Sequence, residues 1–229
     1  MIIMFWEMRM RICLLSTDTL FLSDKEFENA LTALPFGVAD KENLRRIKNK
    51  RAAYQSLGAR VALMRLCGND SFGDIEKTEN GKPYFSKKDP PYFSLAHTKG
   101  IAAAVLCAKN EGLVGIDIEI INSDRNLSNI AERFFSPEEL ERYKKSLSPE
   151  CFYSIWTEKE ARVKLFGKNL SSELSNLSNN ERETLYFYKY KVKFLETYAI
   201  LCVASRQEQK EINFINDEDF EVYGLQNRA

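Results

Sequence analysis

The stretch Val114-Gly-Ile-Asp-Ile-Glu-Ile120 carries the strongest information about both fold and chemistry. Its apolar residues recur at every second position, which predicts a β-strand with Val114 and three isoleucines on one face. Asp117 and Glu119 then share the opposite face. Two like charges at positions i and i+2 repel each other unless a cation or a base neutralises them. The strand therefore presents either a cation-binding face or the solvated face of an edge strand.

A second acidic motif, Trp156-Thr-Glu-Lys-Glu-Ala-Arg-Val-Lys164, reads as a helix. Trp156, Glu160 and Lys164 fall on one stripe at spacing i, i+4, i+8. An ordinary helix ion pair between Glu160 and Lys164 would contribute only about 0.2–0.5 kcal/mol. Trp156 on the same stripe favours a buried face instead, where an acid needs a partner. If this helix packs on the 114–120 strand, three carboxylates and a lysine converge in a site suited to Mg²⁺ and a phosphate substrate.

The composition is that of an ordinary globular protein. The chain has 229 residues, of which 44% are hydrophobic and 29% charged, and its formal net charge is zero. This balance gives no indication of nucleic-acid binding. The apolar N-terminus is too short for a membrane span and lacks the positive residues that open a signal peptide, so no membrane association is expected. Five scattered cysteines without zinc or redox spacing predict reduced thiols and a cytoplasmic protein.

Periodicity and turn residues predict a mixture of helices and strands. The predicted helices are 24–34 behind the cap Ser23, a basic helix 41–66 ended by Gly68, a helix opening at Ser136, and 149–167. The predicted strands are 8–14, 92–96, 101–109, 114–120, 185–194 and 198–204. Two stretches are predicted as loops, 69–91 with a turn at 80–83, and 169–180.

Two short similarities suggest an internal duplication. The tripeptide Ala-Arg-Val begins at position 59 and again at 161, in each case shortly before a glycine that ends the predicted helix. The strand at 103–108 also resembles the strand at 199–204. Chance is the competing explanation for matches this short. A true duplication would give two similar α+β halves that meet near residue 112.

Basic residues form the third candidate feature. The segment from Asp40 to Arg65 holds eight lysines or arginines against two acids, with Ser56 among them, which suits either a polyphosphate or a solvated helix face. Lys82 lies in a Gly-Lys-Pro turn that could equally be a solvated loop. His97 is the only histidine in the chain, so any mechanism that needs two histidines is excluded.

Taken together, these motifs resemble the Sfp-type 4′-phosphopantetheinyl transferases. The matching segments are N-G-K-P-Y-F (80–85), F-S-L-A-H-T (93–98), V-G-I-D-I-E (114–119), R-F-F-S-P-E-E (133–139) and W-T-E-K-E-A-R-V-K (156–164). The resemblance implies an α+β fold of two similar halves, 1–112 with the coenzyme A phosphate contacts and 113–229 with the metal and catalytic motifs. The active site would lie at their interface.

The resemblance also implies an activity, a cofactor and a partner. The enzyme would transfer 4′-phosphopantetheine from coenzyme A to a serine of an apo acyl- or peptidyl-carrier protein, with Mg²⁺, and release 3′,5′-ADP. We expect it to act as a monomer. A different Mg²⁺-dependent phosphate or nucleotide hydrolase and a non-catalytic carrier-binding regulator remain as alternatives. A hydrolase would consume coenzyme A alone, whereas a transferase needs an acceptor serine.

Roles for individual residues follow from the same resemblance. The metal ligands would be Asp117, Glu119 and Glu160. Glu160 is the first choice for the base and Glu139 the second, while Lys164 would stabilise or protonate the leaving phosphate. The residues expected to contact coenzyme A are Lys41, Arg46, Ser56, Lys77, Lys82, Ala96 and His97.

The sequence departs from the family pattern at two places. Ala96 stands where the family often has a serine before the histidine, so a hydroxyl contact is lost and only a backbone N–H remains. Asn43 stands where a basic residue is expected, and Lys41, Arg45 or Arg46 could substitute for it.

Overall fold

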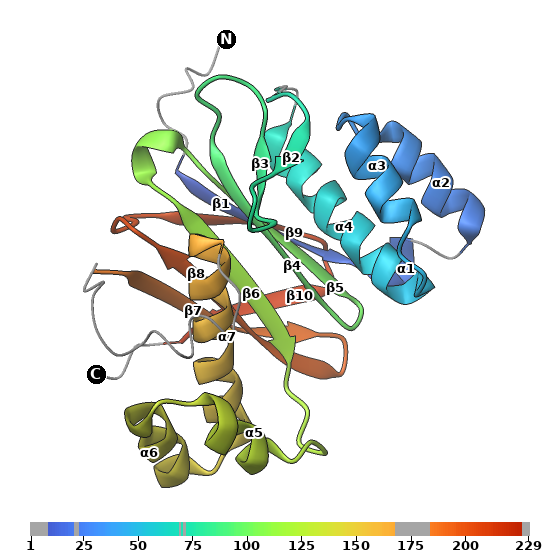
Figure 1. Cartoon of the computed structure of the whole chain (residues 1–229). Helices are drawn as coiled ribbons and strands as arrows, with labels where there is room; N and C mark the ends of the chain where they lie inside the picture. The colour runs from blue at the N-terminus through green and yellow to red at the C-terminus, as the bar shows by residue number, and fades with distance from the viewer. Residues whose placement is uncertain (1–8, 21–22, 69, 71, 168–183, 226–229) are drawn as a thin grey trace.

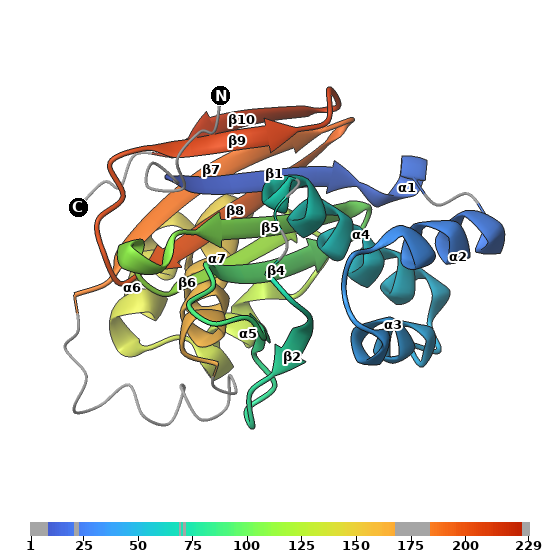
Figure 2. The same ribbon diagram turned by 90° about the horizontal axis from the view of Figure 1, so that it is seen from above.

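The layers of the molecule follow from strands that are buried on both faces. In the computed structural model, which describes residues 9–20, 23–68, 70, 72–167 and 184–225, every side chain of strand β5, Ile101–Cys107, is buried. Such a strand needs cover on both faces. The chain provides it by packing two four-stranded sheets face to face and placing helices on the outer side of each (Figures 1 and 2).

The elements follow one another in a mixed order. The helices are α1 (Thr17–Leu20), α2 (Asp24–Ala33), α3 (Val38–Arg45), α4 (Lys50–Cys67), α5 (Leu127–Phe134), α6 (Pro137–Ser146) and α7 (Pro149–Phe166), with a short 3₁₀ turn at Lys109–Glu111. The strands are β1 (Met10–Ser16), β2 (Ile75–Lys77), β3 (Pro83–Phe85), β4 (Tyr92–Thr98), β5 (Ile101–Cys107), β6 (Val114–Ile120), β7 (Tyr186–Phe194), β8 (Thr197–Ser205), β9 (Ile212–Asn216) and β10 (Phe220–Gly224). The expected mixed α and β composition is confirmed.

Four hydrophobic clusters of the described residues fill the space between and outside the two sheets. Alternate residues of β1, β5, β6 and β8, such as Ile12 and Ile116, fill the space between the two sheets. Helix α4 packs on the outer face of the first sheet through Leu57 and Leu63, and α2 and α3 pack against α4. Helix α7 packs on the outer face of the second sheet, and α5 and α6 pack against its N-terminal part. Within the described residues, no helix is both long and apolar enough to cross a membrane.

The two sheets have related strand orders. The first runs β4-β5-β1-β9 and the second β10-β7-β8-β6. In both, a hairpin (β4-β5 or β7-β8) pairs with the strand that precedes the main helix in the chain (β1 before α4, β6 before α7). The fourth strands differ, because β9 joins β1 in parallel whereas β10 joins β7 antiparallel. The sheet of the N-terminal half thus takes its last strand from residues 212–216.

The structure corrects several expected elements. The basic helix predicted over 41–66 is two helices, because the Asn49 side chain accepts a hydrogen bond from the Ala52 N–H and starts α4 anew. The predicted loop 69–91 contains the hairpin β2-β3, and α5, β9 and β10 were not predicted at all. The loop predicted over 169–180 lies outside the described residues.

Gly115 sets how closely α7 approaches β6. A Cβ atom at this position would lie on top of the Ala161 carbonyl oxygen and 2.5 Å from the Leu165 nitrogen, both in the backbone of α7. Backbone atoms in the middle of a helix cannot move aside individually, so only glycine permits this contact. The close approach brings the functional residues of α7 directly over those of β6.

We therefore expect Gly115→Ala to push α7 away from β6 and to lower the free energy of unfolding by about 1–3 kcal/mol, the usual cost of overpacking. Gly224→Ala is the matched control, since a Cβ at that strand position meets no atom within 4 Å. Urea denaturation of both variants measures the difference. Equal stabilities for the two variants would contradict the close-approach argument.

Candidate active site

The acidic strand and the acidic helix meet as the sequence predicted. Asp117 is buried, and its Oδ1 accepts a hydrogen bond from Lys164 Nζ at 2.8 Å. Its other oxygen, Oδ2, is buried without a hydrogen-bond partner. A buried carboxylate oxygen left unpaired costs free energy, so this atom is suited to receive a further cation.

Burial and the charge of Asp117 perturb two neighbouring acids. Burial and then the Asp117 charge raise the pKa of Glu119 to about 7, against a weaker opposing effect of a hydrogen bond that Thr98 Oγ1 donates to it at 3.2 Å. Burial and the Asp117 charge also raise the pKa of Glu160, while Lys164 lowers it. Asp117 therefore acts electrostatically on both Glu119 and Glu160, and such coupled, perturbed acids are typical of functional sites.

These residues fit a hard divalent cation as a donor set. Among the described residues, no three His, Cys, Asp or Glu side chains already stand close enough to hold one metal ion. The unpaired Oδ2 of Asp117 and the raised pKa values of Glu119 and Glu160 are nevertheless what an oxygen site with excess negative charge produces. All the donors are carboxylate oxygens, the ligand type that Mg²⁺ prefers.

His97 brings the N-terminal half to this site. Its Nε2 lies 3.3 Å from Ser56 Oγ on α4, so the structure brings two of the expected coenzyme A residues together. Desolvation, followed by the positive charges of Lys164 and Arg60, lowers the pKa of His97, although the side chain is exposed at the surface. The lowered pKa favours the neutral imidazole, which can both donate and accept a hydrogen bond.

Lys82 is engaged with the backbone of the C-terminal half. Its Nζ donates to the Leu165 carbonyl at 2.5 Å and to the Val114 carbonyl at 3.3 Å. Burial, assisted by the charge of Arg206, lowers its pKa to about 8. Lys82 thus stabilises the carbonyl end of α7 with two of the three N–H donors of its ammonium group.

The remaining expected coenzyme A residues are dispersed. Lys41 Nζ donates to the Thr32 carbonyl, and Arg46 pairs with Glu42 at 3.5 Å. Lys77 is exposed on β2. Ala96 is buried among the core residues between the sheets.

Glu139 lies in a different environment from the other acids. It occupies the third position of α6 and completes a capping box with Ser136. Its Oε2 accepts hydrogen bonds from the Ser136 N–H and from Lys159 Nζ, both at 2.7 Å. These contacts hold the carboxylate in place, and neither of them involves Asp117, Glu119 or Glu160.

Two residues of the site were missed from the sequence. Arg60, which pairs with the buried Asp40 through two 2.8 Å hydrogen bonds, acts on His97 and lies one helical turn beyond Ser56. That i,i+4 spacing was a usable signal. Thr98 could not be found in this way, since its contact with Glu119 joins two strands that only the fold brings together.

Comparison with known proteins agrees with this geometry. Residues 113–218, which contain the acidic strand and helix, match the family model of the 4′-phosphopantetheinyl transferase superfamily. The chain is 32% identical over 146 residues to a 4′-phosphopantetheinyl transferase of Bacillus subtilis (60% of this chain, 63% of the relative). It is 40% identical over 123 residues to the 4′-phosphopantetheinyl transferase AcpT of Salmonella typhi (52% and 60%). It is 30% identical over 147 residues to the transferase Sfp of Bacillus subtilis strain 168 (60% and 63%).

These matches confirm the resemblance predicted from the motifs: over the matched segments the chain is similar to the Sfp-type 4′-phosphopantetheinyl transferases. The alignments span less than two thirds of the length of these curated relatives, between 60% and 63% for the three named.

The raised pKa of Glu119 generates a prediction for the metal-free protein. Its carboxyl ionises near pH 7 in the folded state but at its ordinary, lower pKa in the unfolded chain, so the folded state loses stability as pH rises through this interval. Glu119→Gln removes this loss. We compare the free energy of unfolding of the variant with that of wild type at each pH. This difference should be more favourable to the variant at pH 8 than at pH 5 by more than about 1 kcal/mol, because one pKa unit corresponds to about 1.4 kcal/mol.

Urea denaturation in the presence of a chelator at both pH values measures this difference. Glu132→Gln, a change of an exposed acid on α5, is the control and should show no such pH dependence. If the free energies of unfolding of Glu119→Gln and wild type differ by the same amount at both pH values, burial and the Asp117 charge do not raise the pKa of Glu119.

Proposed function

We propose that this chain transfers 4′-phosphopantetheine from coenzyme A to a serine of an apo acyl- or peptidyl-carrier protein and releases 3′,5′-ADP. The observation that carries the proposal is the convergence of Asp117, Glu119, Glu160 and Lys164 in the segment that matches the transferase superfamily. The relatives named above carry this activity in their names.

Asp117, Glu119 and Glu160 would hold a Mg²⁺ ion. When bound, Mg²⁺ supplies charge neutralisation for the pyrophosphate of coenzyme A. The unpaired Oδ2 of Asp117 supports its assignment as a ligand. The raised pKa values of Glu119 and Glu160 support the other two, since both carboxylates are destabilised without a counter-charge.

Glu160 is our first choice for the group that accepts the proton of the carrier serine. Its raised pKa makes it a better base near neutral pH than an exposed glutamate. Glu139 is disfavoured, because its carboxylate is already bonded to the Ser136 N–H and Lys159. Lys164 would stabilise negative charge on the leaving phosphate, since its ammonium stands beside Asp117.

Ser56 and His97 would contact phosphate groups of coenzyme A from the N-terminal half. Their side chains already lie within 3.3 Å of each other, and Arg60 supplies a positive charge nearby. Lys82, Lys41, Arg46, Lys77 and the backbone of Ala96 remain weaker candidates, because in the free protein they are bonded elsewhere, exposed or buried.

We further propose that the two halves arose by duplication, with the site between them. The related orders β4-β5-β1 and β7-β8-β6 support this, and so does the location of the matched tripeptides in α4 and α7. A boundary near residue 112 fits the position between β5 and β6, although β9 crosses it. The five cysteines, all free, fit a reducing compartment such as the cytoplasm, and we propose a monomer with no membrane or nucleic-acid partner.

The activity is tested by incubating the protein with Mg²⁺, fluorescent coenzyme A and a panel of apo carrier proteins. We expect label to appear on a carrier with wild type and to fall at least a hundredfold with Asp117→Asn and Glu160→Gln, while circular dichroism shows both variants folded. Consumption of coenzyme A without any carrier would identify a hydrolase instead. A folded variant with near wild-type turnover at saturating Mg²⁺ would remove that residue from the site.

Lys164→Ala separates catalysis from binding. We expect kcat to fall at least tenfold, about 1.4 kcal/mol of barrier, with the KM for coenzyme A within threefold of wild type, because the ammonium matters most when charge builds on the leaving group. Steady-state kinetics and the melting temperature of this variant are the measurements. A kcat within threefold of wild type would leave Lys164 as a structural partner of Asp117.

A further inference from the structure

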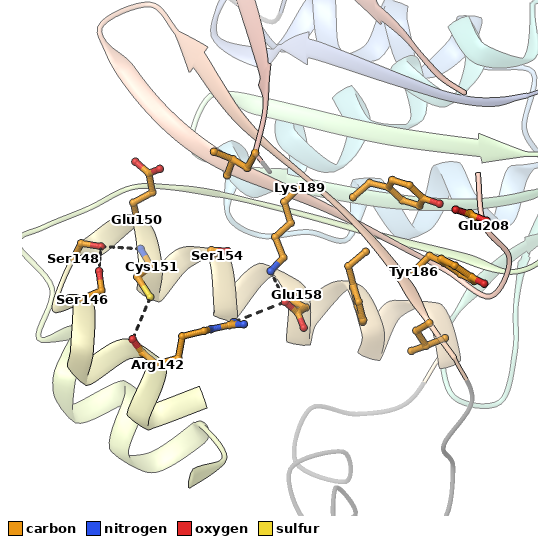
Figure 3. A pocket seen from close by; sticks show the side chains of 14 residues that line it. Arg142, Ser146, Ser148, Glu150, Cys151, Ser154, Glu158, Tyr186, Lys189 and Glu208 are labelled. Carbon is orange, nitrogen blue, oxygen red and sulfur yellow. Dashed lines mark hydrogen bonds and ion pairs between the residues drawn. The ribbon is translucent and has the colours of Figure 1, made fainter. Parts of the chain in front are cut away.

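Helix α7 is attached to the second sheet by ion pairs on both of its flanks. On the flank of β6, Lys164 bonds to Asp117 at 2.8 Å. On the flank of β7, Glu158 Oε2 lies 2.5 Å from Lys189 Nζ. Figure 3 shows Lys189 reaching from its strand to Glu158 on the helix, beside a pocket of about 1000 Å³. The polarity is reversed between the two pairs, since the helix provides the cation on one flank and the anion on the other.

The strand register places these two pairs on one line across the sheet. Asp117 of β6 and Lys189 of β7 are both cross-strand partners of Cys202 on the central strand β8. The two ion pairs therefore lie on either side of Cys202, and α7 runs over it. A force that rotates the helix about its own axis must lengthen at least one of them.

The contact between the two pairs is made mostly by small residues. Beneath the helix, Ala161 and Leu165 pack on Cys202 and Ala204, with Gly115 alongside, whereas the buried aromatic side chains of α7 pack nearer its N-terminus. Small side chains let the backbones approach closely but form shallower ridges and grooves than large ones. The charged flanks therefore add to the rotational restraint in this part of the helix.

Burial makes the β7 flank sensitive to loss of charge. The Lys189 side chain is only 10% exposed, and Glu158 is 28% exposed and also lies 3.9 Å from Arg142. Removing one member of this partly buried pair leaves the other charge uncompensated in a place that is less well solvated than the surface. Lys189 would then move toward solvent and release the helix.

We infer that Glu158 and Lys189 are positioning residues of the active site, which set the rotation of α7 and hence the direction of Glu160 and Lys164. This inference rests on the proposed transfer activity. Glu158 and Glu160 are two residues apart, about 200° around the helix. If the Glu158–Lys189 pair is lost and α7 rotates about its axis, the side chains of Glu160 and Lys164 on the other flank are displaced. The pair acts through the helix and touches none of the reacting groups.

The test uses the full chain and four single variants. Glu158→Gln and Lys189→Met each remove one charge while keeping the size of the side chain, and Lys189→Arg keeps the charge. Lys191→Met is the matched control, because Lys191 pairs with Glu150 at 2.6 Å between the same helix and strand but near the N-terminus of α7. The readouts are kcat, the KM for coenzyme A, and the melting temperature.

We expect Glu158→Gln and Lys189→Met to lower kcat about tenfold with KM within twofold of wild type. For Lys189→Arg and Lys191→Met, both kcat and the KM for coenzyme A should stay within threefold of the wild-type values. A purely stabilising pair would lower the melting temperature and leave the kcat of the folded enzyme unchanged. A kcat within twofold of wild type for both charge-removing variants, or an equal loss for Lys189→Arg and Lys189→Met, would overturn the inference.

A crystal structure of Lys189→Met separates this inference from the proposed function. If wild type transfers nothing to any carrier, the proposed function fails, but the geometry can still be measured. We expect the distance between Lys164 Nζ and Asp117 Oδ1 to exceed hydrogen-bonding range in this variant and to remain near 2.8 Å in Lys191→Met. An unchanged distance in Lys189→Met would overturn the positioning role.

Discussion

The close contact of α7 with β6 is the constraint on which the candidate site depends. Gly115 lets the helix backbone rest directly on the strand, and the Lys164–Asp117 bond lies at this contact. The carboxylates of β6 and α7 share one poorly solvated volume only because the two backbones approach so closely. The energetic consequence is that burial, and then the charge of Asp117, raise the pKa values of Glu119 and Glu160.

A site of this kind is costly to the folded protein without a ligand. One oxygen of Asp117 has no hydrogen-bond partner, and the raised pKa of about 7 leaves Glu119 only partly ionised at pH 7. Stability lost at a functional site must be offset elsewhere, here by the apolar layers between and outside the two sheets. A cation would supply the missing partner of the Asp117 carboxylate, as in the metal-binding role proposed above.

Strand β4 connects the part of the site around His97, in the N-terminal half of the chain, with the acidic residues of β6. Ser94 of β4 accepts a hydrogen bond from the Ile116 N–H of β6, and Thr98 bonds to Glu119. These contacts align His97 with the acids, while Gln55 ties α4 to the Thr98 carbonyl. The junction of the two sheets therefore organises both the proposed metal ligands and the proposed phosphate contacts.

The sequence by itself determined the strand 114–120 and the helix that ends at Gly167, and with them the strand face that carries Asp117 and Glu119 and the helix stripe that carries Glu160 and Lys164. Each rests on a local period of 2 or 3.6 residues, and local periodicity is what a single sequence records. The sequence also carried the family resemblance, because each motif is a continuous segment of the chain.

Only the tertiary structure decided which partners the charged side chains take. Lys82 and Glu139 looked like site residues but are bonded to backbone carbonyls and to Lys159, respectively. The pairing of Lys189 with Glu158 of α7 and the place of β9 in the first sheet could not be predicted from the sequence either. Pairings between residues far apart in the chain depend on how layers stack and on strand register, and no short-range pattern encodes either.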